Sequence, residues 1–416
     1  MIDLKSHAYA LRAASCLLGL SLILTVTPHS TMAATMVPAP DPTQGDGGVS
    51  TFYTWEKAIP ERPGKLLRTE PLPQALALSE AAQQVRILYT SRDGVGDHDA
   101  VVVSGVLYVP AGTPPAHGWP LVAWAHGTTG LADTCAPSWI PHNDSNTRYL
   151  NAWLHAGFAV VATDYQGLGT PGPHPYINMR VLAYSVLDSI RAVPRSRYKV
   201  SPETILVGFS QGAGAAAAAA GYAPHYAPEL KIHGTVVNGV PNLSAESMKS
   251  GTTAAGAEVG VLPYIAMQAR QIHPDLRPED IFTPSGEKLY QEAIHTCLAD
   301  MRQLVSRSGL THDTALKPGM LKVLFDTDMT YKMYPSLKLT HPIFVATGDV
   351  DKAVDTQTQL ALDKQLCDAG TTVEAHLYVG ADHSGTLNAA AADEIVFAHK
   401  VLEGKTVTPI CIPQPQ

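Results

Sequence analysis

The sequence lacks the concentrations of basic residues that nucleic-acid binding requires. Its 37 acidic residues outnumber the 29 lysines and arginines, so the formal net charge is −8 at pH 7. No part of the chain gathers basic side chains into a stripe that could follow a phosphate backbone. We therefore expect no nucleic acid among the partners of this protein.

The sequence also lacks the spacings that are typical of metal sites. Its five cysteines include no C-x-x-C pair, and no cysteine and histidine stand at a metal-ligand interval. We also find no internal repeat. With 45% apolar and 16% charged residues, the 416-residue chain has the composition of a soluble globular enzyme. We expect no metal site in it.

The apolar run near the N-terminus is too short to span a bilayer comfortably. It covers Cys16 to Val26 and follows the basic residues Lys5 and Arg12. The small residues around Ala33 then form a cleavage site, so the pattern predicts a secretory signal peptide over residues 1–33. An uncleaved membrane anchor is the alternative. We expect the mature protein to be secreted or periplasmic.

Four cysteines remain in the mature chain, at positions 135, 297, 367 and 411. An even number in an exported protein favours two disulfides, for which three pairings are possible. Four free thiols are the alternative. The spacing alone does not choose between the pairings.

The N-terminal part of the mature chain has weak structural signals. Residues 34–51 are rich in proline, glycine and polar residues, and we expect them to be mobile. Residues 52–78 hold prolines and no clear period, which favours an extended arm lying over the domain. Val85–Thr90 and Val101–Val109 are β-rich segments separated by a turn-rich stretch, and they predict an antiparallel hairpin.

Short apolar runs alternate with helical patterns from residue 120 onward. Runs of this kind are typical of buried parallel strands, so the chain predicts an α/β fold with a mostly parallel sheet. Residues 243–339 break the rhythm and hold many prolines, which indicates a helical cap inserted between two parts of the core. The expected core parts are 52–242 and 340–416. The expected strands are 120–125, 158–163, 204–209, 235–240, 342–347 and 373–378, and the expected helices include 181–193, 356–369 and 389–402.

The stretch Gly208-Phe-Ser-Gln-Gly212 carries the strongest chemical signal. It matches G-x-S-x-G, it follows an apolar strand, and it leads into a helix of small residues. This order is the context of a nucleophile elbow, in which the serine hydroxyl stands exposed at a helix N-terminus. Ser210 is therefore the expected nucleophile of a serine hydrolase. A glycine-rich turn with an idle serine is the alternative.

A serine nucleophile needs a base and an acid that orients the base. In α/β-hydrolases these follow the serine in the order acid, then histidine. His383 comes shortly after the last expected strand and is the expected base. Asp351 follows the preceding strand and is the favoured acid. Asp349 and Asp382 are the alternatives, although Asp349 is also placed to bind turn amides.

An oxyanion hole needs two amide donors. The amide of Gln211, directly after the nucleophile, is the first. The loop His126-Gly-Thr-Thr-Gly130 follows a strand and resembles the H-G-G-G type, so the amide of Thr128 is the expected second donor. The hydroxyl of Thr128 or of Thr129 can add a further donor there. We expect His126 to support this loop rather than to transfer protons.

Three blocks of the sequence resemble the secretory lipase family. They are His126–Ser138 with its Cys-Ala-Pro-Ser end, Val160–Tyr176 with Asp-Tyr-Gln-Gly-Leu-Gly-Thr-Pro-Gly-Pro, and the elbow at Gly208–Gly212. The similarity extends from about Phe52 to the C-terminus. The resemblance implies an α/β-hydrolase with a helical cap that cleaves acylglycerols or simpler carboxylic esters without a cofactor. It also places the triad on Ser210, Asp351 and His383.

The resemblance further implies the disulfides and the partners. It suggests a bond from Cys135 to the cap, hence Cys135 with Cys297, which leaves Cys367 for Cys411. It implies an ester or lipid substrate, a transient contact of the cap with a lipid interface, and no obligate protein partner. A serine peptidase of the same fold and an inactive hydrolase fold used for binding are the competing interpretations.

Overall fold

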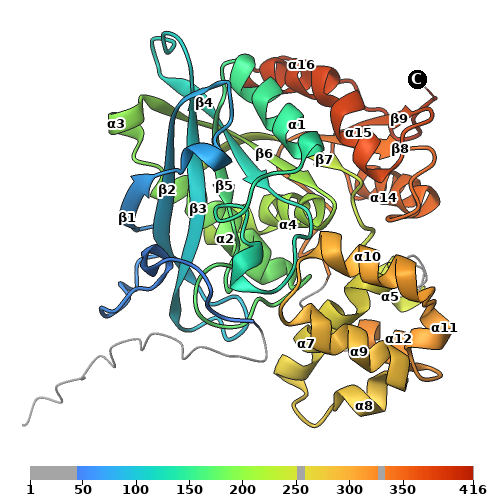
Figure 1. The fold of residues 1–416 in the computed structure, drawn as a ribbon. Helices are drawn as coiled ribbons and strands as arrows, with labels where there is room; N and C mark the ends of the chain where they lie inside the picture. The colour runs from blue at the N-terminus through green and yellow to red at the C-terminus, as the bar shows by residue number, and fades with distance from the viewer. Residues whose placement is uncertain (1–44, 251–257, 327–332, 416) are drawn as a thin grey trace, which may run out of the picture. The chain divides into compact units, whose positions relative to one another are not determined.

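The computed structural model describes residues 45–250, 258–326 and 333–415. Within these residues nine strands form one sheet in the order β1-β2-β3-β5-β4-β6-β7-β8-β9 (Figure 1). The strands are β1 (Leu66–Pro71), β2 (Ala81–Arg92), β3 (Ala100–Pro110), β4 (Trp119–Ala125), β5 (Ala159–Thr163), β6 (Val200–Phe209), β7 (Lys231–Asn238), β8 (Ile343–Gly348) and β9 (Val373–Tyr378).

The neighbours β1, β2, β3 and β5 are paired antiparallel in turn, and the remaining neighbours from β5 to β9 are parallel. The predicted α/β-hydrolase class is confirmed, and so is the hairpin, which pairs β2 with β3 from Arg92↔Ala100 to Ala81↔Pro110. The expected arm over residues 52–78 was wrong in one respect. Leu66–Pro71 is an edge strand paired with β2, and its half-buried pattern with a proline at the end concealed it.

Helices cover both faces of the sheet. They are α1 (Asp144–His155), α2 (Met179–Ala192), α3 (Arg195–Tyr198), α4 (Gln211–Tyr226), α5 (Ala245–Ser250), α7 (Leu262–Ile272), α8 (Pro278–Ile281), α9 (Pro284–Ala293), α10 (Leu298–Ser308), α11 (His312–Ala315), α12 (Met320–Asp326), α14 (Thr356–Asp368), α15 (His383–Ala389) and α16 (Ala391–Leu402). Short 3-10 turns lie at Thr51–Tyr53, Gln74–Leu76, Asp133–Cys135 and Val259–Val261.

The side-chain alternation of the strands divides the core into two layers. In β4, Leu121 and Ala123 pack in the layer that holds α2 and α4, whereas Val122 and Trp124 pack in the layer that holds α1 and α16. Both layers are fully buried, because a parallel sheet is covered on both faces. The alanine run of α4 is buried throughout, and its small side chains allow close packing on α2 and the sheet.

The helices from α5 to α12 stand between β7 and β8 in the chain (Figure 1). This is the helical insertion that the sequence predicts. Their buried residues, among them Leu262, Met267 and Leu298, belong to the same hydrophobic cluster as α2 and α4. The insertion therefore shares a core with the sheet.

Only part of the N-terminal region for which the sequence makes predictions lies within the described residues. The predicted signal peptide lies outside the described residues, as does the expected mobile segment up to residue 44. From Gly45 onward the chain is bonded to the core, because the Gly47 amide donates to Asp133 at 2.7 Å and the Gly172 amide donates to Asp46 at 3.0 Å. In the described part of the chain, no helix has both the length and the apolar character needed to cross a bilayer.

Candidate active site

The turn between β6 and α4 holds Ser210 in a backbone conformation that few residues adopt. Its φ is +57° and its ψ is −120°, and the residue stands at the N-cap of α4. A non-glycine residue in such a region costs about 1–3 kcal/mol and persists only where its surroundings hold it. Here the Ser210 amide donates to the carbonyl of Asn238 at 2.9 Å, which fixes the turn to the end of β7.

The two glycines of the motif are required by close backbone approach. A Cβ on Gly208 would lie 2.0 Å from the carbonyl oxygen of Gly212, and a Cβ on Gly212 would lie 1.9 Å from that of Ala125. No side chain fits at either position, so strand, turn and helix pass each other at backbone contact. This geometry is that of a nucleophile elbow.

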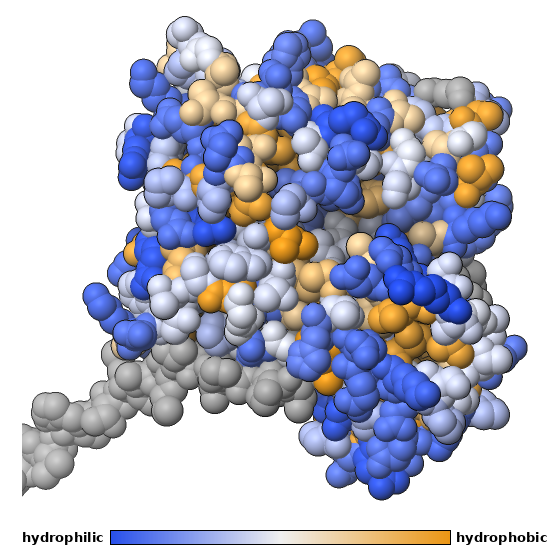
Figure 2. Space-filling model, viewed as in Figure 1, coloured by the Kyte–Doolittle hydropathy of each residue, from blue (hydrophilic) through white to orange (hydrophobic). Residues whose placement is uncertain are grey.

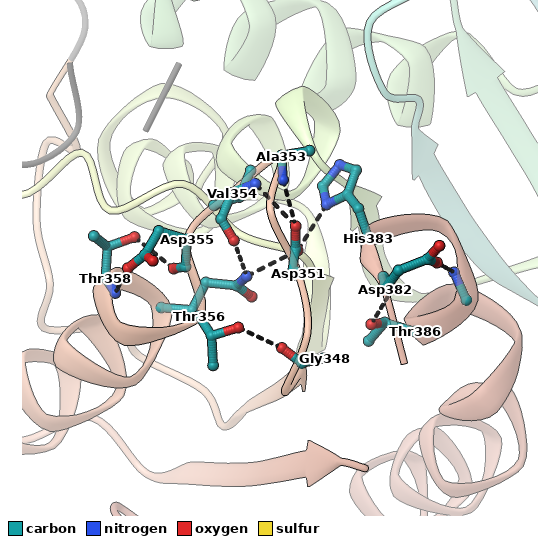
Figure 3. Close-up of polar contacts among 12 residues, drawn as sticks. Gly348, Asp351, Ala353, Val354, Asp355, Thr356, Thr358, Asp382, His383 and Thr386 are labelled. Atoms are coloured by element: carbon teal, nitrogen blue, oxygen red, sulfur yellow. Dashed lines mark hydrogen bonds and ion pairs between the residues drawn. The ribbon is translucent and has the colours of Figure 1, made fainter. Parts of the chain in front are cut away.

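A buried carboxylate and a histidine form the second part of the site (Figure 3). His383 Nδ1 lies 2.8 Å from Asp351 Oδ2, and both residues are buried. Asp351 Oδ1 accepts the amides of Ala353 and Val354 at 2.9 Å each, and Oδ2 accepts Gln359 Nε2 at 3.0 Å. The carboxylate is therefore fully hydrogen-bonded and points at the imidazole.

These contacts decide the charge of the acid. Burial by itself opposes ionisation of Asp351, but the bond to His383 and the two turn amides outweigh burial, so the pKa of this carboxyl lies below its usual value. An ionised Asp351 accepts the proton on His383 Nδ1. That leaves Nε2 as the nitrogen able to take a proton from another group.

The two alternative acids bind backbone amides instead. Asp349 Oδ1 accepts the amide of Gly380 at 2.7 Å and so joins the turns after β8 and β9. Asp382 is the N-cap of α15, and its Oδ1 accepts the amide of Gly385 at 2.7 Å. Asp351 is the aspartate that is hydrogen-bonded to His383.

His383 also lies close to the elbow. Its ring centre is 4.8 Å from that of Phe209, the residue before Ser210. On another side it lies over Gly239, where a Cβ would approach His383 Cε1 to 2.8 Å. Gly239 has a φ of +58°, so both its conformation and its lack of a side chain make room for the imidazole.

The loop expected to supply the second oxyanion donor lies against the elbow. A Cβ on Gly127 would be 3.3 Å from Ser210 Cβ, and the hydroxyl of Thr128 is hydrogen-bonded to that of Tyr176 at 2.8 Å. His126 is buried outside the pocket, with Nδ1 2.6 Å from the carbonyl of Gly127. Burial lowers the pKa of His126 to about 4, so its ring supports the loop as a neutral group.

One pocket gathers the sequence-predicted residues. Its volume is about 190 Å³, and Ser210, Gln211, Thr128, Thr129 and His383 line it together. Asp351 stands behind His383 and does not line it. Side chains from the helical insertion complete the wall, namely Leu243, Glu258, Val261, Ile265, Leu298, Arg302 and Phe325.

Sequence reasoning missed the polar side chains of this wall. Arg302 donates to Glu258 through Nε at 3.0 Å and Nη2 at 2.9 Å, although the two residues are 44 positions apart. Asn143 and Asn146 line the pocket from the start of α1. No local pattern joins these residues, and only Tyr176 stood in a block that the sequence singled out.

The cysteine pairs expected from the sequence are the pairs that the structure joins. Cys135 is bonded to Cys297 and Cys367 to Cys411, across 162 and 44 positions. The first bond lies beside the 126–130 loop, because a Cβ on Gly130 would be 2.7 Å from Cys135 Sγ. The amide of Leu298 also donates to the carbonyl of Thr129 at 2.7 Å. The start of α10 is thus fixed to this loop twice.

We expect the Cys135→Ala/Cys297→Ala variant to lose both stability and turnover. A cross-link over this length restricts the unfolded chain, which corresponds to roughly 5 kcal/mol in the chain-entropy model, with native strain able to reduce it. Urea unfolding measures this loss, and ester turnover below the transition measures the effect on the loop. The matched control is Cys367→Ala/Cys411→Ala, which should lose stability but keep kcat. Equal kcat for both variants would contradict a role of the first bond at the site.

A buried acid lies behind the elbow. Glu394 on α16 has no exposed surface and accepts the hydroxyl of Tyr149 at 2.5 Å, and Asn238 Nδ2 lies 3.5 Å from the same hydroxyl. Burial raises the pKa of Glu394 to about 8, with its hydrogen bonds opposing part of the rise. The carbonyl of Asn238 holds the Ser210 amide, so this acid supports the turn from behind.

The raised pKa predicts a pH-dependent stability. Between about 4.5 and 8 the folded protein holds a proton on Glu394 that the unfolded chain releases, so stability falls as pH rises, by up to about 1.4 kcal/mol per unit. We expect the free energy of unfolding of Glu394→Gln, measured in urea and compared with that of the wild type, to rise progressively from pH 5 to pH 8. The exposed Glu56→Gln is the control. Wild-type and Glu394→Gln stabilities that run parallel across this range would refute the expectation.

Within residues 45–250, 258–326 and 333–415, no group of three or more histidine, cysteine, aspartate or glutamate side chains is placed to hold a metal ion.

Fold and site together define an α/β-hydrolase. A family model described as secretory lipase matches residues 143–409, which is more than half of the chain, and the chain belongs to that family. It is thus a carboxylic ester hydrolase. Among curated relatives, it is 24% identical to lipase 5 of Candida albicans over 74% of this chain and 70% of that one. It is also 24% identical, over 77% of this chain and 74% of that one, to a Mycobacterium tuberculosis protein whose name describes it as a probable inactive lipase.

Solved structures with the same fold include two enzymes. Candida antarctica lipase A superposes with a TM-score of 0.66 at 19% identity, covering 91% of this chain and 90% of that one. The rice cell wall degrading esterase LipA from Xanthomonas oryzae, in a ligand-bound form, superposes with a TM-score of 0.65 at 19% identity, covering 83% of this chain and all of that one. At these identities the likeness shows the fold.

Proposed function

We propose that the protein is a secreted serine esterase or lipase that works through an acyl-enzyme. The observation that carries the proposal is the Asp351–His383 pair beside a strained Ser210, with serine and histidine lining one pocket. Because one relative is named as inactive, family membership alone does not establish the mechanism. The assignment rests on these three side chains.

In the proposed reaction, Ser210 Oγ attacks the ester carbonyl carbon while His383 Nε2 takes the serine proton. Asp351 holds the imidazole in the required tautomer and stabilises its charged form. The amides of Gln211 and Thr128 bind the oxyanion. His383 returns the proton to the leaving alcohol, and water then attacks the acyl-enzyme through the same base.

The substrate side of the pocket favours an acyl ester. Its wall combines apolar residues of the helical insertion, such as Val261 and Ile265, with a small number of polar groups. Figure 2 shows hydrophobic residues gathered beside the hydrophilic ones of α10, over the region of α9 and α12. In α12, Val323 is 37% exposed. We infer that this cap surface makes a transient contact with a lipid interface, without an obligate protein partner.

Export is the proposed route to the site of action. It is supported by the secretory family, by the two disulfides, and by the predicted signal peptide over residues 1–33. The destination is the periplasm or the medium. N-terminal sequencing of the mature protein tests the cleavage near Ala33.

A substrate panel tests the proposed function. Purified protein is assayed with p-nitrophenyl esters from acetate to palmitate, with triolein emulsion, and with amino-acid anilides. Turnover of esters but not of anilides supports an esterase or lipase. Preferential cleavage of anilides would support the peptidase interpretation, and binding without turnover of any substrate would support an inactive hydrolase fold.

A further inference from the structure

The segment from Asp164 to His174 follows β5 and has no role in the proposed reaction. It belongs to a block that the sequence singled out, and its two aromatic rings are buried. Tyr165 has a φ of +73° although it is a large residue, a conformation that costs free energy and persists where its surroundings enforce it. Such an outlier beside a pocket invites a functional explanation.

Tyr165 holds the start of the oxyanion loop. Its hydroxyl donates to the carbonyl of His126 at 2.8 Å, and its ring lies 4.4 Å from the His126 ring. The same carbonyl would be 2.6 Å from a Cβ on Gly212, so it lies against the first turn of α4. The phenol therefore fixes the point where the loop leaves β4 and passes the elbow.

His174 holds the side chain of Gln211, the residue whose backbone amide is the other expected oxyanion donor. Its Nδ1 lies 2.9 Å from the carbonyl of Gln166, which can only accept, so Nδ1 carries a proton. Burial lowers the pKa of His174 to about 4, which keeps the ring neutral and leaves Nε2 as an acceptor. Gln211 Nε2 lies 3.3 Å from His174 Nε2 and donates to it. The ring also stacks on Tyr165 at 6.0 Å.

We propose that Tyr165 and His174 are positioning residues of the oxyanion hole, Tyr165 through the His126 carbonyl and His174 through the Gln211 side chain. The inference rests on the proposed function, since it assumes that the oxyanion binds between Gln211 and the 126–130 loop. A preorganised donor stabilises the transition state only if it is held in place before the reaction. The Tyr165 ring, tilted against His126 and stacked on His174, ties both donors to one segment.

The first test removes the phenol hydroxyl. Tyr165→Phe keeps the ring stack and should lower kcat about tenfold or more with KM changed less than about twofold, a smaller loss than that of a whole oxyanion donor. Tyr89→Phe is the matched control, because Tyr89 is also buried and donates to a backbone carbonyl, that of Ser185, at 2.9 Å. It should lose comparable stability and keep kcat.

The second test asks whether His174 acts through Gln211. His174→Phe retains a ring but no acceptor, and should lower kcat about tenfold in the wild type and less than about twofold when Gln211 is already leucine. His174→Gln supplies an acceptor oxygen and should recover most of the rate. His341→Phe is the control. His341 lies just before β8, at the amino ends of the parallel strands, and is hydrogen-bonded to Thr235 of β7.

A trifluoromethyl ketone separates positioning from general damage. Ser210 Oγ adds to its carbonyl carbon and the serine proton passes to His383, so the former carbonyl oxygen becomes an oxyanion in the hole. Its affinity should fall in Tyr165→Phe and His174→Phe by the same factor as kcat/KM, whereas the KM of a short ester should not move.

Three results would overturn the proposal. The first is that Tyr165→Phe and His174→Phe both keep the kcat and the ketone affinity of the wild type. The second is that His174→Phe lowers kcat as much in the Gln211→Leu background as in the wild type. The third is that Tyr89→Phe loses as much kcat as Tyr165→Phe. Ser210→Ala is measured alongside. If that variant keeps wild-type turnover, the proposed function itself has failed, and the two failures are thereby distinguished.

Discussion

Replacing Ser210 by alanine is expected to lower ester kcat/KM by about 10⁴-fold or more while the fold stays intact. In the proposed mechanism this hydroxyl forms the acyl-enzyme, so its loss would remove the covalent route and leave only binding and oxyanion stabilisation. The side chain makes no bond that the N-cap position needs, because the Ser210 backbone amide is the group held by Asn238. Steady-state hydrolysis of a short p-nitrophenyl ester measures the loss, and circular dichroism checks the fold.

The matched control for this substitution is Ser189→Ala. Ser189 is a buried serine of α2 whose hydroxyl donates to the carbonyl of Val186 at 2.7 Å, remote from the pocket wall. A fluorophosphonate should label the wild type and the Ser189 variant on a peptide that contains Ser210, and should not label Ser210→Ala. Labelling of a different serine, or unimpaired turnover in Ser210→Ala, would show that the nucleophile has been misassigned.

The sheet was predictable where the sequence carries local signals. Buried parallel strands such as Ala159–Thr163 and Ile343–Gly348 are uninterrupted apolar runs, and the hairpin partners are rich in β-branched residues. β1 carries neither signal. Its residues are half-buried at the sheet edge and end in a proline, so tertiary pairing with β2 decides its conformation.

The candidate site divides in the same way. The elbow is encoded locally, because the two glycines that flank the serine stand at positions where a Cβ does not fit. His383 and Asp351 were placed by chain order and by their positions after strands. The choice between Asp351 and Asp349 depends on which carboxylate the turn directs at the imidazole, and sequence spacing favoured Asp351 without excluding the other.

The pocket wall was beyond sequence reasoning for a physical reason. Glu258 and Arg302 meet only because the Val259–Val261 turn packs on α10 within the insertion, and Cys297 ties that insertion to the loop at Gly130. Helical amphipathicity predicts which side of a helix is buried but not which partner it meets. The wall of the pocket is therefore the part of the site that the sequence leaves undetermined.

The two aspartates after β8 offer the sharpest remaining comparison. Asp351 Oδ2 accepts hydrogen bonds from both His383 Nδ1 and Gln359 Nε2. In Asp351→Asn, the amide nitrogen at that position is itself a donor and cannot accept either bond. The imidazole would then favour the tautomer with its proton on Nε2, which cannot accept the serine proton. Asp349 Oδ1 accepts a backbone amide, that of Gly380, and an asparagine oxygen can do the same.

We therefore expect Asp351→Asn to lower kcat by about 10⁴-fold, the size of effect that a wrong histidine tautomer produces in serine hydrolases, with KM little changed. Asp349→Asn is the matched control and should stay within about threefold of the wild type. Both asparagines can still accept the turn amides through Oδ1, including those of Ala353 and Val354 in the first variant, so both proteins should unfold at similar urea concentrations. Steady-state kinetics near neutral pH decides the matter. A larger loss in Asp349→Asn than in Asp351→Asn would mean that the acid lies two residues earlier and that the 2.8 Å contact to His383 is not the catalytic one.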